Sequence, residues 1–175
     1  LVVRKGAYTG EILINLVTTS EITFSLDEFK NAILSNEYQG SIAGILHTKN
    51  DGIADVVKSD ETNLIYGKDY FMEKLLGLDF TFSAFSFFQT NTLGAEKLYS
   101  VVRDFVGNTK DKIVFDLYCG TGTIGQIVAS NAKKVIGIEI IEEAVEAAIK
   151  NSKLNNIDNC EFIAGDVSKT VKNLK

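Results

Sequence analysis

The sequence predicts an α/β protein in which a small β-rich α+β domain, residues 1–84, precedes the first part of a doubly wound parallel sheet, residues 85–175. Two observations predict this organisation. Short apolar runs separated by turn signals dominate the first half of the chain. In the second half, apolar runs that end in an acid alternate with helical patterns, as in a parallel sheet with crossover helices. Only three such runs are present, so we expect a sheet that stops after its third strand.

The first domain is expected to contain short strands and one helix. Residues 25–28, Ser-Leu-Asp-Glu, match a capping box and start an amphipathic helical pattern that runs to about Ser35. The first two strands carry apolar residues on both faces, so we expect a hairpin that is buried on both sides. His47, the only histidine, has no partner pattern and is interpreted as a surface or core residue. The expected strands span 2–4, 10–18, 41–48, 53–57, 64–66 and 70–75.

An unusually aromatic segment, residues 78–91, connects the two domains. Phe80 and Phe82 alternate with polar neighbours, as in a buried connecting strand. Gln89 and Asn91 follow the apolar run just before a helical pattern. We expect these amides to cap the helix or to face a ligand.

The second domain is organised around residues 112–125, Lys-Ile-Val-Phe-Asp-Leu-Tyr-Cys-Gly-Thr-Gly-Thr-Ile-Gly. This pattern predicts a buried strand, a tight turn and a helix that begins inside the turn. Gly120, Gly122 and Gly125 match the G-x-G-x-x-G spacing, in which absent side chains let backbone N–H groups approach a ligand. The other elements of this domain are expected as strands at 134–139 and 160–164 and helices at 92–105, 122–130 and 142–154.

The glycine spacing alone does not identify the ligand, because dinucleotide-binding and S-adenosylmethionine-binding folds share it and a loop without a ligand also satisfies it. Asp116, four residues before Gly120, would place negative charge where a dinucleotide needs room for its pyrophosphate. A carboxylate suits S-adenosylmethionine better, since that methyl donor carries a sulfonium and an ammonium group. We therefore predict an S-adenosylmethionine site and keep a nicotinamide or flavin site as the alternative.

Three acids end three successive predicted strands, and ligands of such sheets bind outside these carboxyl ends. We expect Asp116 to orient the methionine part of the donor, Glu139 to accept both ribose hydroxyls, and Asp166 to accept from the adenine amino group. The alternative for each acid is a helix cap or a solvated strand end. Cys119 is interpreted as a packed residue of the turn rather than a nucleophile.

The composition narrows the possible function classes. The net charge is −5, and residues 1–90 hold 7 basic and 12 acidic residues while residues 91–175 hold 11 of each, so no strong polyanion-binding surface is expected. No apolar run is long enough to span a bilayer and the first residues lack the layout of a signal peptide, which predicts a cytoplasmic protein without a membrane partner. Two cysteines outside any metal-ligand spacing predict neither a disulfide framework nor a metal site.

Four motifs together resemble the RNA uracil-5-methyltransferases, bacterial enzymes that methylate uridines of 23S ribosomal RNA or of transfer RNA. They are Phe-Phe-Gln-Thr-Asn at 87–91, Asp-Leu-Tyr-Cys-Gly-Thr-Gly-Thr-Ile-Gly at 116–125, Gly-Ile-Glu at 137–139 and Gly-Asp at 165–166. The resemblance covers nearly the whole chain and implies a partial Rossmann-like, S-adenosyl-L-methionine-dependent methyltransferase sheet and an RNA substrate. It also implies donor-binding roles for Gln89, Tyr118, Thr123, Glu139 and Asp166. Many relatives have asparagine at the position of Thr123.

The resemblance also indicates what the chain lacks. In that family a cysteine thiolate adds to uracil C6, the resulting enolate attacks the methyl group, and a glutamate base then removes the C5 proton. These groups follow an Asp-Pro-Pro-Arg segment on the fourth strand, whereas this chain has no proline and neither Cys119 nor Cys160 matches the nucleophile. We therefore expect an excerpt of a longer protein that binds the donor at most and does not methylate RNA by itself. The amino-terminal RNA-binding barrel and cysteine cluster of many relatives are also absent.

Three other functions stay open at this point. The same donor site would serve a methyltransferase that acts on a protein or a small molecule. A dinucleotide-dependent oxidoreductase domain shares the glycine turn. A non-catalytic RNA-binding module is disfavoured by the lack of a basic stripe.

Overall fold

The computed structural model describes residues 1–52 and 61–174, so the strand expected at 53–57 lies outside the described residues. Contacts between backbone positions group the chain into two compact units. One comprises Leu1–Glu73 and Phe82–Phe85, and the other comprises Lys74–Thr81 and Ser86–Lys175. The sequence predicts a single boundary at residue 84, whereas the hairpin before that residue contributes to both units.

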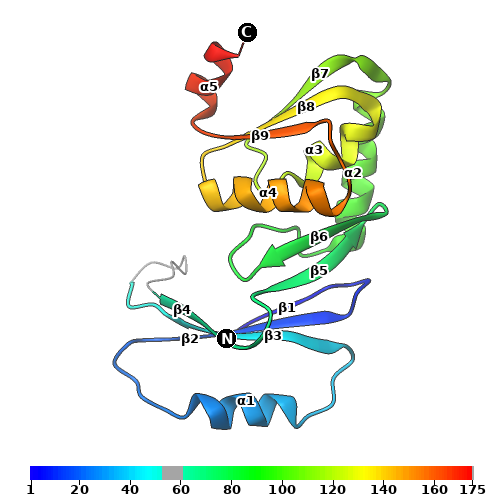
Figure 1. The fold of residues 1–175 in the computed structure, drawn as a ribbon. Helices are drawn as coiled ribbons and strands as arrows, with labels where there is room; N and C mark the ends of the chain where they lie inside the picture. The colour runs from blue at the N-terminus through cyan, green and yellow to red at the C-terminus, as the bar shows by residue number, and fades with distance from the viewer. Residues whose placement is uncertain (53–60, 175) are drawn as a thin grey trace. The chain divides into compact units, whose positions relative to one another are not determined.

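The first unit is built on a sheet with the strand order β1-β2-β3-β4 (Figure 1). Its strands are β1 (Val2–Lys5), β2 (Glu11–Thr18), β3 (Ser41–Lys49) and β4 (Glu61–Gly67). β1 pairs antiparallel with β2, β2 pairs parallel with β3, and β4 pairs antiparallel with β3. Helix α1 (Leu26–Leu34) forms the crossover that the parallel pair requires. Ser25 caps this helix by accepting a hydrogen bond from the Glu28 N–H at 3.2 Å, as the capping box predicts.

The core of this unit lies on the two inner strands, where Leu13 and Ile45 are buried. The expectation that the first hairpin is buried on both sides is wrong for β1, because β1 is the edge strand of the sheet and Val3 is exposed. His47 is a core residue, as expected. Its Nε2 lies 2.8 Å from the Thr18 hydroxyl oxygen.

A hairpin of β5 (Tyr70–Leu75) and β6 (Leu78–Ser83) contributes residues to both units. Phe80 and Phe82 are fully buried on β6, which confirms the strand predicted from their alternation. Within the first unit, the buried Glu73 carboxylate accepts hydrogen bonds from the N–H groups of Ala7 and Tyr8 at 2.5 and 3.1 Å. These bonds fix the turn between β1 and β2.

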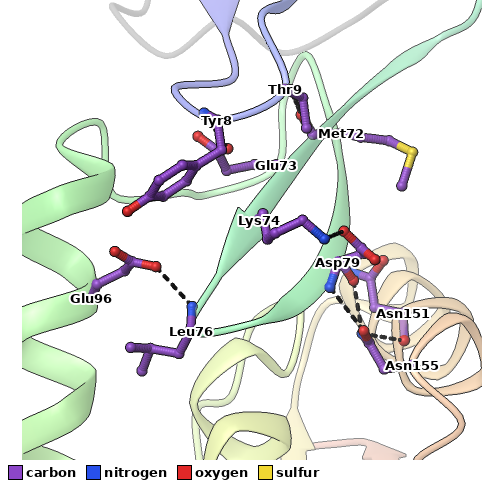
Figure 2. A network of polar contacts seen from close by, with 10 residues as sticks. All are labelled: Tyr8, Thr9, Met72, Glu73, Lys74, Leu76, Asp79, Glu96, Asn151 and Asn155. Carbon is purple, nitrogen blue, oxygen red and sulfur yellow. Dashed lines mark hydrogen bonds and ion pairs between the residues drawn. The ribbon is translucent and has the colours of Figure 1, made fainter.

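The second unit holds its own part of the hairpin through polar contacts (Figure 2). The Leu76 N–H donates to the Glu96 carboxylate at 2.8 Å. The Asn155 side chain accepts from the Asp79 N–H at 2.8 Å and donates to the Asp79 carbonyl at 2.7 Å. The tip of the hairpin is therefore anchored on the helices of this unit.

The second unit is an α/β domain whose sheet has the order β7-β8-β9 with both pairings parallel (Figure 1). Strands alternate with helices along the chain, as the sequence predicts. The elements are α2 (Thr92–Val106), β7 (Thr109–Leu117), α3 (Thr123–Val128), a 3₁₀ turn η1 (Ala129–Asn131), β8 (Ala132–Glu139), α4 (Glu142–Leu154), β9 (Cys160–Ala164) and α5 (Val167–Asn173). This arrangement confirms the predicted partial Rossmann-like sheet.

Helices cover the two faces of this sheet unequally. α3 and α4 lie on one face, and α5 lies on the other (Figure 1). On the first face, Val128 of α3 packs with Val135 of β8. On the second, Val167 of α5 packs against Ile136 and Ile138 of β8. Among the described residues, no helix is both long and apolar enough to cross a membrane.

Candidate functional site

The glycine turn between β7 and α3 adopts the backbone that the sequence predicts for a ligand loop. Tyr118, Gly120 and Gly122 have positive φ angles of 64°, 54° and 70°. The turn is tied to the sheet by the Cys119 N–H, which donates to the Ile138 carbonyl at 3.1 Å. A left-handed conformation is unusual for a bulky residue such as tyrosine, and such strain is concentrated at functional sites.

The two glycines of the turn meet different surroundings. A Cβ atom at Gly120 would have no heavy atom within 4 Å, so this backbone is open to a ligand. A Cβ at Gly122 would lie 2.5 Å from the Phe162 ring and 2.8 Å from the Ala148 methyl. Gly122 therefore allows the turn to pack on α4 and β9, whereas Gly120 provides an exposed approach.

The Asp116 side chain points from the end of β7 toward the first turn of α3. Its Oδ2 accepts a hydrogen bond from the Gly125 N–H at 2.8 Å, in the first turn of α3. Gly122, the N-cap residue, has no side chain to satisfy this group, so Asp116 takes the capping role. Burial raises the pKa of Asp116, and the Gly125 N–H partly opposes this rise. The carboxylate thus supports the helix that follows the glycine turn.

Glu139 ends β8 beside the turn and binds three backbone N–H groups. Its Oε2 accepts from Gly120 at 3.1 Å, and its Oε1 accepts from Ile140 at 2.8 Å and from Ile141 at 3.0 Å. A carboxylate offers about four acceptor positions. About one acceptor position is left for a ligand hydroxyl, whereas two ribose hydroxyls were expected from the sequence to donate to Glu139.

Asp166 follows β9 and caps α5. Its carboxylate accepts from the Lys169 N–H at 3.1 Å and from the Ser168 hydroxyl at 2.5 Å. These two bonds, the Ser168 bond first, lower the pKa of Asp166. The side chain is therefore ionised at neutral pH.

The three acids do not form one row. In the register of the sheet, Asp116 pairs with Gly137, two residues before Glu139, while Asp166 lies two residues beyond Ala164, the partner of Glu139. The structure brings Glu139 next to the turn at Gly120, places Asp166 further out along the same edge, and turns Asp116 toward α3.

The other predicted site residues take distinct positions. Tyr118 is 74% exposed at the turn. Thr123 is buried, and its hydroxyl oxygen lies 3.2 Å from that of Thr121. Gln89 is partly buried in the loop before α2, and its side chain forms no hydrogen bond within the described part of the chain. Asn91 caps α2 by accepting from the Gly94 N–H at 2.9 Å, one of the two roles expected for it.

Neither cysteine has the properties of a nucleophile. Burial, followed by the charges of Asp116 and Glu139, raises the pKa of Cys119 to about 12. Burial, followed by the charge of Asp116, raises the pKa of Cys160 to about 12. Both thiols are protonated at neutral pH, and the thiolate is the reactive form.

Two apolar side chains at this edge were not singled out from the sequence. Ile140 and Ile141 follow Glu139 directly and are 61% and 53% exposed. An exposed apolar pair beside a carboxylate suits a flat ring that carries a hydroxylated sugar. The signal in the sequence was an Ile-Ile pair outside the strand pattern.

Comparisons with known proteins point to methyltransferases. Residues 108–175 match a family described as a methyltransferase domain. An uncharacterized RNA methyltransferase of Clostridium tetani is 63% identical over the whole chain, which spans 38% of that protein. The chain is also similar to the crystal structure of Pyrococcus abyssi tRNA (uracil-54, C5)-methyltransferase in complex with S-adenosyl-L-homocysteine, with a TM-score of 0.75 and 29% sequence identity. The match covers 94% of this chain and 38% of the Pyrococcus abyssi chain.

A tRNA m1G37 methyltransferase of M. jannaschii also shares the fold, with a TM-score of 0.59, 19% identity, and 95% of this chain and 48% of that one covered. The chain spans about two fifths of the length of the curated relative from Clostridium tetani. The resemblance to RNA methyltransferases stated from the motifs is thus confirmed over the whole chain, and its second unit has a methyltransferase-like fold.

Proposed function

We propose that this chain forms the donor-binding part of an S-adenosylmethionine-dependent RNA methyltransferase. The observation that carries the proposal is the contact between the glycine turn and the end of β8, where the Glu139 carboxylate accepts the Gly120 N–H beside an open backbone surface. A ligand at this edge meets a carboxylate, a backbone of positive φ and exposed apolar side chains. These groups suit an adenosine with a cationic tail.

The residues of the edge would divide the donor between them. Glu139 accepts a ribose hydroxyl, and Ile140 and Ile141 contact the adenine ring. Asp166 accepts from the adenine amino group, because its ionised carboxylate has acceptor capacity beyond its two bonds. The exposed Tyr118 ring lies at the opening of the turn.

The methionine part of the donor would meet the remaining predicted residues. Asp116 supplies negative charge from behind the turn, and this charge attracts the ammonium and sulfonium groups through the backbone of α3. Gln89 offers an uncommitted amide, while Thr123 shapes the start of the helix. S-adenosylmethionine supplies an electrophilic methyl group when bound.

RNA is the acceptor that the relatives support, and C5 of uridine in ribosomal or transfer RNA is our finer proposal. The motifs at 87–91 and 116–125 support it, together with the likeness to a tRNA (uracil-54, C5)-methyltransferase. Because both thiols of this chain are protonated and partly buried, neither activates a uracil ring. The activating nucleophile is expected elsewhere in a longer protein, which we place in the cytoplasm.

Titration calorimetry with S-adenosylhomocysteine and with NAD tests the donor site. We expect binding of S-adenosylhomocysteine and no binding of NAD. Glu139→Gln should weaken binding about tenfold or more, because a hydrogen bond to a charged group contributes about 1.5–3 kcal/mol. Glu146→Gln is the matched control, since Glu146 is exposed on α4 and has no part in the proposed donor contacts. Tighter binding of NAD would instead support the oxidoreductase alternative.

A methylation assay tests the acceptor. The 175-residue chain with labelled S-adenosylmethionine and total RNA should transfer no methyl group to uridine. Transfer to uridine would show that the missing nucleophile is supplied within this chain. Transfer to protein or to a small molecule would support the other methyltransferase alternatives.

A further inference from the structure

A cavity lies at the amino-terminal ends of the strands of the parallel sheet, at the edge opposite the glycine turn. It has a volume of about 380 Å³ and is lined by Lys110 near the start of β7, Ala132 at the start of β8 and Asn159 just before β9. The glycine turn and Glu139 lie at the carboxyl ends of these strands. β8 has eight residues and so extends over roughly 25 Å. The cavity is therefore separate from the donor edge.

The floor of this cavity is apolar. Ile127, Ala129 and Ala132 are almost fully buried beneath it. Leu76, Leu78 and Ile157 supply further apolar lining. Its volume lies within the range of about 300–1,000 Å³ that is usual for small-molecule sites. A flat ring fits such a floor.

Two cations and one acid line this cavity. Arg103, in the last turn of α2, is partly buried, and Lys110 is exposed. Within residues 1–52 and 61–174, neither side chain forms a hydrogen bond or an ion pair with another side chain. Asp158 is the acid of the lining, and its one negative charge is outnumbered by the charges of Arg103 and Lys110, so the net charge of the lining is positive. A guanidinium and an ammonium in the lining of one cavity favour a phosphate, which accepts hydrogen bonds from either group.

A polar acceptor completes the lining. The Asn159 amide nitrogen donates to the carbonyls of Ala129 and Ala132 at 2.9 and 3.2 Å. These bonds fix the side chain and leave its Oδ1 without a donor in the described part of the chain. A base with an exocyclic amino group would satisfy this oxygen.

We propose that this cavity binds a nucleotide, with the phosphate on Arg103 and Lys110 and the base on the apolar floor beside Asn159. The same chemistry is offered by a free mononucleotide and by one nucleotide of an RNA strand. This site does not depend on the donor site. It gives the acidic chain a local contact for a phosphate, which its net charge does not predict.

The test is a titration of the 175-residue protein with adenosine monophosphate and with a ten-nucleotide oligoadenylate at low salt, in the presence of S-adenosylhomocysteine. Arg103→Gln and Lys110→Gln should each weaken binding about tenfold, as expected for the loss of a charge-assisted contact. Lys153→Gln, on an exposed lysine of α4 outside the lining, is the control and should leave binding unchanged. Thermal unfolding of each variant checks that it is folded.

Each outcome decides the proposal. Tighter binding of the oligonucleotide than of the mononucleotide identifies a nucleotide of RNA as the ligand. In that case the slope of the logarithm of the binding constant against the logarithm of the salt concentration should fall by about one in each cavity variant. Equal affinities identify a free mononucleotide. Absence of binding overturns the proposal, and so does binding that neither Arg103→Gln nor Lys110→Gln weakens. Binding that is lost only in Glu139→Gln places adenosine monophosphate at the donor edge and also overturns it.

Discussion

At the scale of single residues, two glycines that are equivalent in the sequence motif have different roles. Gly120 and Gly122 both need positive φ, but only Gly122 is enclosed by other atoms. Phe162 approaches Gly122 from β9 and also fills the space beside Gly137 on β8. One aromatic ring thus sets the packing of the turn against the sheet.

Substitution should separate these roles. Gly122→Ala should destabilise the protein by several kcal/mol, because the new methyl adds overpacking of about 1–3 kcal/mol to the left-handed strain of about 1–2 kcal/mol. Gly120→Ala should lower the free energy of unfolding only by the left-handed strain, and it should weaken binding of S-adenosylhomocysteine. Urea unfolding measures the first effect and calorimetry the second. Equal destabilisation by the two variants would contradict the assigned packing role of Gly122.

The buried Asp116 carboxyl predicts a pH dependence of stability. Its pKa is raised in the folded state by burial, so folding favours the protonated form. The stabilisation is fully present below the unfolded pKa and is lost as the pH rises through the folded pKa. Asp116→Asn should remove this decline while its amide oxygen still accepts the Gly125 N–H. Urea unfolding at several pH values, with the exposed Asp158→Asn as control, measures the difference.

A steeper decline of the free energy of unfolding with rising pH in Asp116→Asn than in the original protein would contradict this reasoning.

The role of Asp116 also shows what the sequence alone does not predict. The motif identifies the acid and its strand, but the direction of its side chain depends on where the first turn of α3 places the Gly125 N–H. Likewise, the motif selects Glu139 but does not reveal that backbone N–H groups use most of its acceptor positions.

At the scale of elements, β7 is an edge strand with an apolar face. Ile113, Phe115 and Leu117 are 51%, 46% and 44% exposed, while Val114 between them packs toward α3. An edge strand also presents unpaired backbone groups. The combination favours pairing between copies of the chain.

We therefore expect the 175-residue chain to self-associate as its concentration rises. Phe115→Lys should reduce this association, because charge on an edge strand opposes pairing. Phe105→Lys is the matched control: Phe105 is 88% exposed, but it lies on α2, where no strand edge is available. Light scattering across a concentration series measures both. An equal effect of the two variants would indicate general hydrophobic association instead of pairing at β7.

The elements themselves were largely predictable, because their signals are local. The capping box at Ser25, the alternation of Phe80 with Phe82, and the alternating strands and helices of the second unit all appear in the structure. Pairing between distant strands was not predictable. The parallel partnership of β2 with β3 leaves β1 at the edge, which is why the exposure of Val3 was missed.

At the scale of the whole molecule, the proposed donor edge and its supporting residues all belong to the second unit. The glycine turn, Glu139 and Asp166 lie within residues 86–175, and the buried Leu13 and Ile45 belong to the first unit. A ligand stabilises the state that binds it by RT ln(1 + [L]/Kd), which is about 2.7 kcal/mol at a hundredfold excess over Kd. That stabilisation acts on the part of the chain whose unfolding destroys the site.

We therefore expect S-adenosylhomocysteine to raise the free energy of local unfolding in the second unit and to leave the first unit nearly unchanged. Hydrogen exchange should slow at the amides of Cys119, Gly120 and Gly125, which donate to Ile138, Glu139 and Asp116. The amides of β2 and β3 should keep their exchange rates. At the same ligand concentration, Glu139→Gln should reduce the slowing, because it weakens the binding that drives it. If the ligand slowed exchange equally in both units, their unfolding would be coupled, and the donor site would stabilise the chain as a single cooperative domain.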